Sequence, residues 1–384
     1  MPLLYFIDHD QLSISLLSAR FFAPFPYLCA MQRDIRHLSL PEIQEIFTSL
    51  GLEKFRAKQV HEWLWKKSAK SFDEMTNLSK PLRDQLKANF AFENIDESIA
   101  QISADGTVKL GIKLADQRIV EGVMIPDKDR ATACVSSQVG CTLSCTFCAT
   151  GFLKRERNLS AAEIYDQVVL LNDYAKKHNG RGLTNIVYMG MGEPLLNYDN
   201  VMQSVKHITS PDGLNMAQKR ITISTSGIAR NIKRLADEGM KINLALSLHA
   251  PTDAKRNIIM DINRSNPLDM VFDSLNYFYE KTGNKITFEY ILFDGFNDSI
   301  EDAENLIALY HRVPAFINII EFNNVEGVTL KRVKSEKRIA FVNHLKSRGI
   351  NVAVRRSRGK DIDAACGQLA NKQDTMALRT NAVV

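Results

Sequence analysis

The sequence has few cysteines outside one short stretch, few tryptophans, and no excess of acidic residues. Its 384 residues include six cysteines, two tryptophans and eleven prolines. So few cysteines exclude a disulfide scaffold in a chain of this length. The composition, 45% hydrophobic and 24% charged residues, is typical of a globular protein. A net charge of +5 permits a polyanionic partner without requiring one.

The sequence also lacks an apolar run that could cross a membrane or begin a secretory signal. Residues 1–30 carry Asp8 and Asp10 early and two prolines late. A signal peptide would instead have a basic start and a continuous apolar core. We interpret residues 1–30 as a non-native or disordered extension that precedes Met31. We expect a cytoplasmic monomer without membrane contact.

Three cysteines lie within eight residues, C-T-L-S-C-T-F-C, and no fourth cysteine follows closely. They are Cys141, Cys145 and Cys148, and the nearest downstream histidine is His178. A structural zinc site normally has four protein ligands, which this stretch does not supply. Three thiolates can instead hold a cubane iron–sulfur cluster and leave one iron open. The spacing favours a 4Fe–4S cluster, with zinc and inert buried thiols as the alternatives.

The hydrophobic patterning predicts an α/β fold with a small N-terminal all-helical domain. Residues 31–100 read as helices, and Ser39 with Glu42 forms a capping box. Residues 101–130 read as a β-hairpin. From 131 to 360, strands alternate with helices, which predicts a partial (β/α)6 TIM-like barrel. Residues 361–384 form a C-terminal segment that contains Cys366.

Polar residues recur where the predicted parallel strands end, which is the rim that carries the chemistry of such barrels. The loop G-M-G-E-P follows one strand, and glycine there allows a close approach of a ligand to the backbone. Taken one at a time, these residues are more often simple hydrogen-bonding groups at strand ends. The candidates are Gly192, Glu193, Ser224, Ser247, Leu248, His249 and Asn323.

The cysteine spacing resembles that of the radical S-adenosylmethionine (SAM) enzymes. Phe147 before the last cysteine fits their aromatic preference, and G-M-G-E-P resembles their loop that holds the methionine amino group. This resemblance implies the radical SAM type of barrel, in which SAM binds the open iron. It also implies that the seven residues at the strand ends contact SAM.

A set of motifs in order resembles one family, the RlmN dual-specificity RNA methyltransferases. The motifs are C-V-S-S-Q-V-G-C-T-L-S-C-T-F-C-A-T-G, M-G-M-G-E-P-L-L-N, I-S-T-S-G, S-L-H-A-P and D-I-D-A-A-C-G-Q-L. The resemblance covers about residues 31–372. It implies methylation of adenosine C2 in the peptidyl-transferase centre of 23S rRNA and at the position 3′ of the tRNA anticodon. It further implies an electron donor such as flavodoxin or ferredoxin.

The same resemblance implies a mechanism with two further cysteines. Cys366 would take a methyl group from one SAM, and a second SAM would activate that methyl group through a radical. Cys134 would then resolve the adduct by a disulfide with Cys366, and Glu121 would accept the proton from C2. Each of these cysteines alone would be read as a buried thiol. We therefore expect Cys134 and Cys366 to lie close together near the open iron.

RNA binding would need cations for the phosphate groups. Three basic stretches are candidates, although each alone is more often a solvated surface. They comprise Lys154, Arg155 and Arg157; then Lys331, Arg332, Lys334, Lys337 and Arg338; and then Arg355, Arg356 and Arg358.

Three other functions remain open at the level of the sequence. The first is a Cfr-like methyltransferase that modifies adenosine C8, from which Pro194-Leu195-Leu196 separates the chain only weakly. The second is a zinc-dependent RNA-binding module. The third is an activase that generates a glycyl radical in a partner protein, which would not need Cys134 or Cys366.

Overall fold

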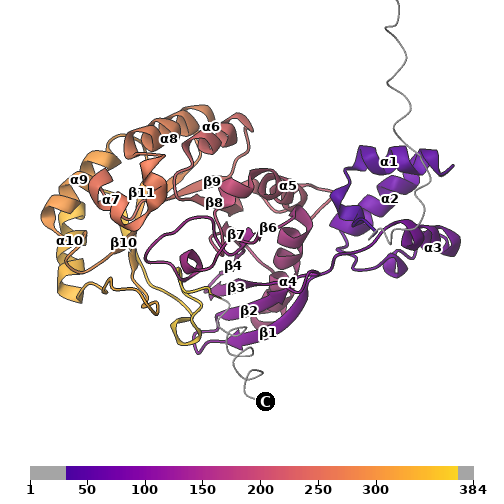
Figure 1. The fold of residues 1–384 in the computed structure, drawn as a ribbon, viewed down its shortest axis with the longest axis horizontal. Helices are drawn as coiled ribbons and strands as arrows, with labels where there is room; N and C mark the ends of the chain where they lie inside the picture. The colour runs from indigo at the N-terminus through magenta and orange to yellow at the C-terminus, as the bar shows by residue number, and fades with distance from the viewer. Residues whose placement is uncertain (1–31, 371–384) are drawn as a thin grey trace, which may run out of the picture.

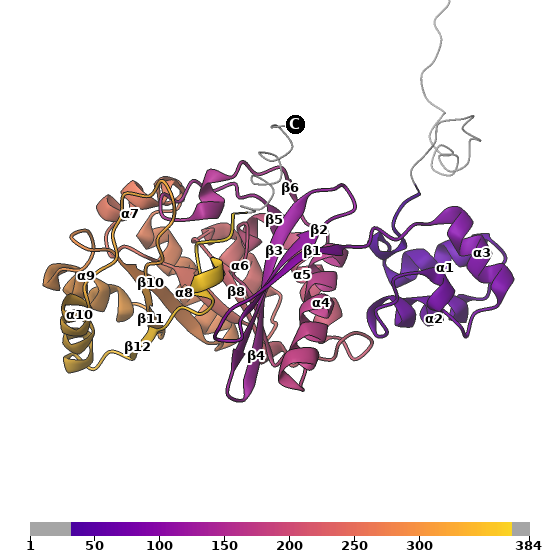
Figure 2. The ribbon, with the colours of Figure 1, turned by 90° about the horizontal axis from the view of Figure 1, so that it is seen from below.

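The computed structural model describes residues 32–370, so the interpretation of residues 1–30 as an extension falls outside the described residues. Figure 1 shows a small group of helices at one end and a larger part built on a sheet of ten strands. Figure 2 shows the same two parts from below, with the helices beyond the edge of the large part. The α/β fold class with an N-terminal helical part is confirmed.

The helical part forms because short amphipathic helices share one apolar centre. Ser39 caps the first helix through the reciprocal hydrogen bonds with Glu42, as the capping box predicted. Phe47, Val60 and Leu82 are buried between the helices. The helices are η1 (Ile35–His37), α1 (Leu40–Ser49), α2 (Lys54–Trp65), η2 (Phe72–Glu74) and α3 (Lys80–Asn89).

A buried ion-pair network joins the helical part to helix α4 (Ala161–Asn179) of the large part. Arg36 pairs with Asp34 at 2.8 Å and with Asp166 of α4 at 2.5 Å. The Arg36 side chain is 3% exposed and the Asp34 side chain is fully buried. Separating the members of such a buried network would leave an uncompensated charge, which costs free energy. The network therefore favours one arrangement of the two parts.

Aromatic stacking completes this junction. Trp65 at the end of α2 stacks on His207 of helix α5 (Tyr198–Thr209), with centroids 3.6 Å apart and planes at 8°. Its ring also meets Tyr165 edge to face at 5.1 Å. Burial lowers the pKa of His207 to about 3, so the stacked ring is neutral.

The chain enters the sheet through antiparallel strands. They are β1 (Asp96–Ile102), β2 (Val108–Lys113), β3 (Ile119–Asp127) and β4 (Arg130–Cys134). The predicted hairpin is β2 and β3, which pair antiparallel. Strand β1 was not predicted from the sequence, because its residues D-E-S-I-A-Q-I are mostly exposed and do not alternate.

From β4 onward the pairing in the ten-stranded sheet is parallel, and within residues 32–370 six crossover helices connect its seven parallel strands. After β4 come β7 (Asn185–Tyr188), β8 (Ile221–Thr225), β9 (Asn243–Ser247), β10 (Ile286–Leu292), β11 (Phe316–Glu321) and β12 (Val352–Arg355). The crossover helices are α4, α5, α6 (Ala229–Asp237), α8 (Leu268–Thr282), α9 (Ile300–Tyr310) and α10 (Ser335–Ser347). All seven residues of β10 are buried, as expected for a strand covered on both faces.

Shorter elements lie in the connections. They are β5 (Gln138–Val139), η3 (Ala149–Phe152), β6 (Arg157–Asn158), η4 (Pro194–Asn197), η5 (Gln218–Arg220), α7 (Asp253–Ile259), η6 (Asp261–Arg264) and η7 (Lys360–Ile362). None of the helices in the described part of the chain has the length and apolar character needed to cross a membrane.

Candidate active site at the ends of the parallel strands

The loop with Cys141, Cys145 and Cys148 follows β4, at the carboxyl ends of the parallel strands. All three side chains are partly exposed. The backbone N–H of Leu143 donates to Sγ of Cys141 over 3.4 Å. A side chain at Gly151 could not fit, because its Cβ would lie 2.6 Å from the carbonyl oxygen of Cys145. The close approach of η3 therefore shapes this loop.

An apolar wall lies beside the cysteine loop. The ring of Phe147 lies 4.8 Å from that of His249 and 5.7 Å from that of Phe293. Cys145 and Cys148 pack against the same group of side chains. This wall limits the access of water to one side of the loop.

The three thiols fit the donor set of a cluster. Burial raises the pKa of Cys141 to about 11 and raises that of Cys145 and Cys148 as well, so without a cationic centre the thiols stay protonated. A bound metal centre reverses this, because it stabilises thiolates directly. No group of three His, Cys, Asp or Glu side chains in residues 32–370 surrounds a single metal ion. A cubane cluster does not need such a group, because each thiolate binds a different iron.

The segment that carries Cys366 lies against the cysteine loop. The N–H of Ala149 donates to the carbonyl oxygen of Gly367 over 2.8 Å. The hydroxyl of Thr150 donates to the carbonyl oxygen of Leu369 over 2.7 Å. These bonds place the exposed thiol of Cys366 beside the loop, and the charges of Cys366 and Cys148 influence each other.

Cys134 is the last residue of β4, and its thiol interacts electrostatically with that of Cys366. Its side chain is 8% exposed, and burial together with the charge of Cys366 raises its pKa to about 12. Both cysteines also interact electrostatically with Arg355, the last residue of β12. All five cysteines of the described residues are free thiols.

Glu121 of β3 also contacts the C-terminal segment. Its Oε2 accepts a hydrogen bond from the N–H of Ala370 over 2.8 Å. Its Oε1 lies 3.4 Å from Nζ of Lys109, and both side chains are less than a tenth exposed. In both Figure 1 and Figure 2 the yellow end of the described chain lies beside β3.

The G-M-G-E-P loop turns sharply at Gly192 and buries Glu193. Gly192 has φ +95°, and an added Cβ would lie 2.5 Å from Cβ of Gln138, so only glycine fits. The carboxylate of Glu193 accepts from the N–H of Leu195 at 3.1 Å and from that of Ser226 at 2.8 Å. Burial raises its pKa. A carboxylate can accept further hydrogen bonds, so these two leave room for a ligand.

The other predicted SAM contacts lie along the same rim. Ser224 donates to the carbonyl oxygen of Tyr188 over 2.7 Å. His249 accepts from the N–H of Ile291 at Nδ1 over 3.2 Å, so Nε2 carries its proton. Asn323 donates to the hydroxyl of Ser357 over 2.9 Å. The structure thus brings Ser224, Ser247, Leu248, His249 and Asn323 to neighbouring strand ends.

Sequence reasoning missed the buried cation that ties these strand ends together. Arg256 of α7 is fully buried and donates to the carbonyl oxygens of Ser226, Ser247 and Leu248. Its fourth partner is Asn263 at 2.6 Å. Burial lowers its pKa to about 10. Nothing in its sequence context distinguished it from an exposed helical arginine.

Glu289 was also missed, although its context offered a signal. It is the acidic residue of the otherwise apolar strand I-T-F-E-Y-I-L and is 5% exposed. Its Oε1 accepts from Asn318 over 2.8 Å, whereas its Oε2 has no hydrogen-bond partner. Burial raises the pKa of Glu289, and the charge of Arg355 acts in the opposite direction.

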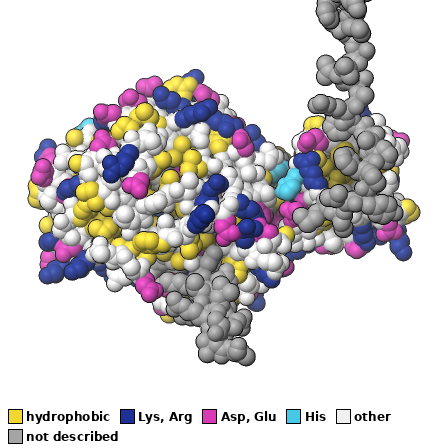
Figure 3. All heavy atoms as spheres, viewed as in Figure 1, with side chains coloured by type: hydrophobic (Ala, Val, Ile, Leu, Met, Phe, Trp, Pro, Cys, Tyr) yellow, Lys and Arg dark blue, Asp and Glu magenta, His cyan; other side chains and the backbone are white. Residues whose placement is uncertain are grey.

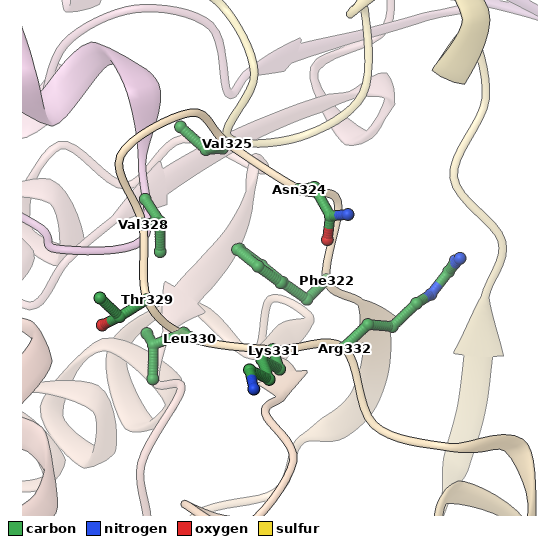
Figure 4. A pocket seen from close by; sticks show the side chains of 8 residues that line it. All are labelled: Phe322, Asn324, Val325, Val328, Thr329, Leu330, Lys331 and Arg332. Carbon is green, nitrogen blue, oxygen red and sulfur yellow. The ribbon is translucent and has the colours of Figure 1, made fainter.

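The loop after β11 encloses a cavity of about 650 Å³ next to this rim. Figure 4 shows Phe322 pointing into the ring of backbone that the loop forms, and Arg332 extending away from it. Gln368 fixes the loop to the C-terminal segment by donating to the carbonyl oxygen of Asn324 over 3.2 Å. This hydrogen bond connects the loop to the segment that carries Cys366.

Five of the eleven predicted basic candidates are already paired with carboxylates, namely Arg157, Arg332, Lys337, Arg338 and Arg358. Arg157 binds Glu163 at 2.7 Å, Lys337 binds Asp294 at 2.8 Å, and Arg358 lies 3.8 Å from Asp127. On the face seen in Figure 3, the Lys and Arg side chains lie in several separate groups. The Arg356 side chain is one of those with no hydrogen-bond or ion-pair partner among residues 32–370.

Two family models match the chain. The model of the radical SAM superfamily matches residues 135–307. The model described as "Ribosomal RNA large subunit methyltransferase N-terminal domain" matches residues 33–91, which span the helical part.

Curated relatives match nearly the whole chain. A protein of Cytophaga hutchinsonii, named "Probable dual-specificity RNA methyltransferase RlmN", is 52% identical over 355 residues, which are 90% of this chain and 97% of that protein. A protein of Salinibacter ruber with the same name is 43% identical and covers 88% of this chain and 94% of its own length. The crystal structure of a radical SAM methyltransferase from Sphaerobacter thermophilus aligns with a TM-score of 0.83 at 39% identity, over 88% of this chain and 99% of that one.

Proposed function

Because the chain belongs to the RlmN family of radical SAM RNA methyltransferases, we propose that it methylates C2 of adenosine and uses Cys366 as the methyl carrier. The proposed targets are an adenosine in the peptidyl-transferase centre of 23S rRNA and the adenosine 3′ of the tRNA anticodon. The radical SAM family implies a 4Fe–4S cluster and SAM. The proposal also includes the use of two SAM per turnover and the reduction of the cluster by flavodoxin or ferredoxin. It further includes that the protein acts as a monomer in the cytoplasm.

One observation carries the proposal: the exposed thiol of Cys366 lies beside the loop of Cys141, Cys145 and Cys148. The hydrogen bonds from Ala149 and Thr150 to the C-terminal segment support this arrangement. We propose the three loop thiolates as the ligands of the cluster. We propose that SAM contacts the rim residues Gly192, Glu193, Ser224, Ser247, Leu248, His249 and Asn323.

The chemistry explains why a second reactive thiol is needed. C2 of adenine is an electrophilic aromatic carbon and cannot displace the methyl group of SAM directly. The thiolate of Cys366 can, because a thiolate is a good nucleophile. The cluster, when bound, supplies the electron that cleaves SAM and so provides the radical that activates the methyl group on Cys366.

The remaining steps fall to residues of the chain. Cys366, joined through its methylene carbon to C2, holds the RNA covalently. The radical adduct gives up one electron, and Glu121 accepts the proton that leaves C2. Cys134, once deprotonated, then attacks Sγ of Cys366, so that the S–S bond forms as the bond from Sγ to the methylene carbon breaks. The methylene carbon keeps the electron pair of that bond and takes up a proton, which gives the methyl group on C2. A thiol reductant must restore both thiols before the next turnover.

The arrangement around Cys134 supports this order of events. Its thiol is buried and stays protonated at neutral pH, so it does not compete with Cys366 for SAM. Arg355 lies near both sulfurs and favours negative charge on either one. Disulfide exchange needs sulfurs within reach of each other, and the interaction between the two cysteines is consistent with that.

The test is anaerobic expression of the wild type and Cys366→Ala, followed by mass spectrometry of tryptic peptides and of host rRNA and tRNA nucleosides. We expect a methyl group on the Cys366 peptide and 2-methyladenosine only for the wild type. The appearance of 8-methyladenosine instead would assign the chain to C8 chemistry. An unmodified Cys366 peptide without a new nucleoside would overturn the proposal.

A further inference from the structure

A second cavity lies beside the proposed site, and its volume is about 490 Å³. It forms where the end of β11, helix α10 and the loop after β12 meet the turn between β1 and β2. Glu321, Arg338, Arg356, Ser357 and Lys360 line it together with the turn residues 103–105. It is therefore built from parts of the chain far apart in sequence.

One carboxylate in this cavity is surrounded by three cations. Glu321 accepts from Nη2 of Arg332 at 2.5 Å, from Nζ of Lys360 at 2.9 Å, and from Arg338. Its side chain is 13% exposed. A single carboxylate neutralises one of three positive charges, and two of the three cations, Arg338 and Lys360, line the cavity.

The two other carboxylates of the cavity, those of Asp105 and Asp361, bind neighbouring backbone and hydroxyl groups of the chain. Asp361 accepts from the hydroxyl of Ser103 at 2.5 Å and from the N–H of Ala104 at 3.1 Å. Asp105 accepts from the N–H of Gly359 at 3.0 Å. Both hold the β1–β2 turn against the loop after β12 and pair with no cation among residues 32–370.

Arg356 is exposed and supplies a guanidinium that no described residue binds. Its neighbour Ser357 accepts the hydrogen bond from Asn323, one of the proposed SAM contacts. Arg355, on the other side of Arg356, interacts with Cys366 and Cys134. Arg356 lines the cavity, whereas Arg355 interacts with the two cysteines, so a ligand of Arg356 would lie next to the site.

We propose that this cavity binds a phosphodiester group of the RNA substrate, close to the nucleotide that reacts. Arg356 is its main ligand because a guanidinium donates two parallel hydrogen bonds to a phosphate. Lys360 and the hydroxyl of Ser357 complete the site. The lining carries three cations and three carboxylates, and Arg332, which binds Glu321 from the neighbouring cavity, adds a fourth cation. The excess of one positive charge matches the single charge of a phosphodiester. The inference rests on the proposed function, because it takes RNA as the substrate.

The experiment measures binding of an unmodified tRNA transcript, with adenosine 3′ of its anticodon, to the full chain carrying its cluster. The variants are Arg356→Ala and Arg356→Lys, and Arg348→Ala is the matched control because Arg348 pairs with Glu304 at the far end of α10. We expect Arg356→Ala to weaken binding about tenfold, the usual loss for a charged hydrogen bond. Its plot of log affinity against log salt should be shallower by about 0.7 to 0.9.

Arg356→Lys keeps the charge and loses the paired geometry, so it should restore the salt slope and only part of the affinity. Methylation of Cys366 by SAM needs no RNA, and it should be the same in all variants if they are folded. Wild-type affinity and slope for Arg356→Ala would overturn the phosphate site and leave the proposed function intact. A wild type that neither binds nor methylates the transcript or rRNA would instead overturn the function.

Discussion

The N–H of Ala370 donates a 2.8 Å hydrogen bond to Oε2 of Glu121, and this bond ties the segment of Cys366 to β3. The carboxylate also lies 3.4 Å from Lys109. In the proposed mechanism Glu121 therefore has two tasks, since it holds the segment in place and accepts the proton of C2. The two tasks can be separated by substitution.

Glu121→Gln keeps an oxygen for the N–H of Ala370 and removes the proton acceptor. We expect normal methylation of Cys366, accumulation of a covalent enzyme–RNA adduct on denaturing gels, and a loss of 2-methyladenosine of about 100-fold or more. Glu121→Ala is the comparison, because it removes both roles and should also slow methylation of Cys366. Normal turnover by Glu121→Gln would contradict a role in proton transfer.

The different burial of Cys134 and Cys366 predicts different reactivity towards iodoacetamide. Cys366 is exposed, whereas burial raises the pKa of Cys134 to about 12. At pH 7 we expect alkylation of Cys366 well before Cys134. Between pH 7 and 9 the rate at Cys134 should rise about tenfold per pH unit, as its thiolate fraction does. Peptide mass spectrometry of the cluster-bound protein follows both rates, and equal rates at pH 7 would refute the prediction.

Arg355 should speed the first methyl transfer because it lies near the Sγ atoms of Cys366 and Cys134. The charge of Cys366 raises the pKa of Arg355, and the attraction is mutual. We expect Arg355→Gln to slow SAM-dependent methylation of Cys366 about threefold to tenfold. Arg355→Lys should keep most of the rate, since it retains the charge. A single-turnover assay with labelled SAM measures this, and identical rates in all three proteins would count against the role.

The junction of Trp65 and His207 predicts a loss of stability in acid. The folded pKa of His207 is about 3, below its ordinary value of 6.5, so between these values the unfolded chain binds more protons. Stability is therefore full above pH 6.5 and falls as pH drops towards 3, by up to about 1.4 kcal/mol per pH unit. His61, whose pKa burial also lowers, adds to this trend.

Urea unfolding at pH 7.5, 6.5 and 5.5, followed by tryptophan fluorescence, checks this prediction. Both tryptophans of the chain, Trp63 and Trp65, lie in α2, so the signal reports on the helical part and its junction. His207→Gln cannot titrate, and its stability should depend less steeply on pH than that of the wild type. An equal slope in both proteins would show that His207 is not the responsible group.

Local signals in the sequence predicted the elements well. The capping boxes at Ser39 and Ser160 are present, because the N-cap side chain and the residue three positions later need only each other. Alternating strands and helices predicted the parallel sheet. Strand β1 escaped prediction because it is held by pairing with β2 rather than by an apolar pattern of its own.

The sequence by itself determined the type of fold, the cysteine loop and its position after a parallel strand, because these depend on spacing and periodicity. Only the tertiary structure decided which distant groups meet. Three features join parts of the chain that lie tens to hundreds of residues apart. They are the contact of the Cys366 segment with η3, the buried Arg256 that binds the strand ends, and the cavity around Arg356. Such contacts follow from how the sheet curves and the loops pack, and no local pattern of residues records them.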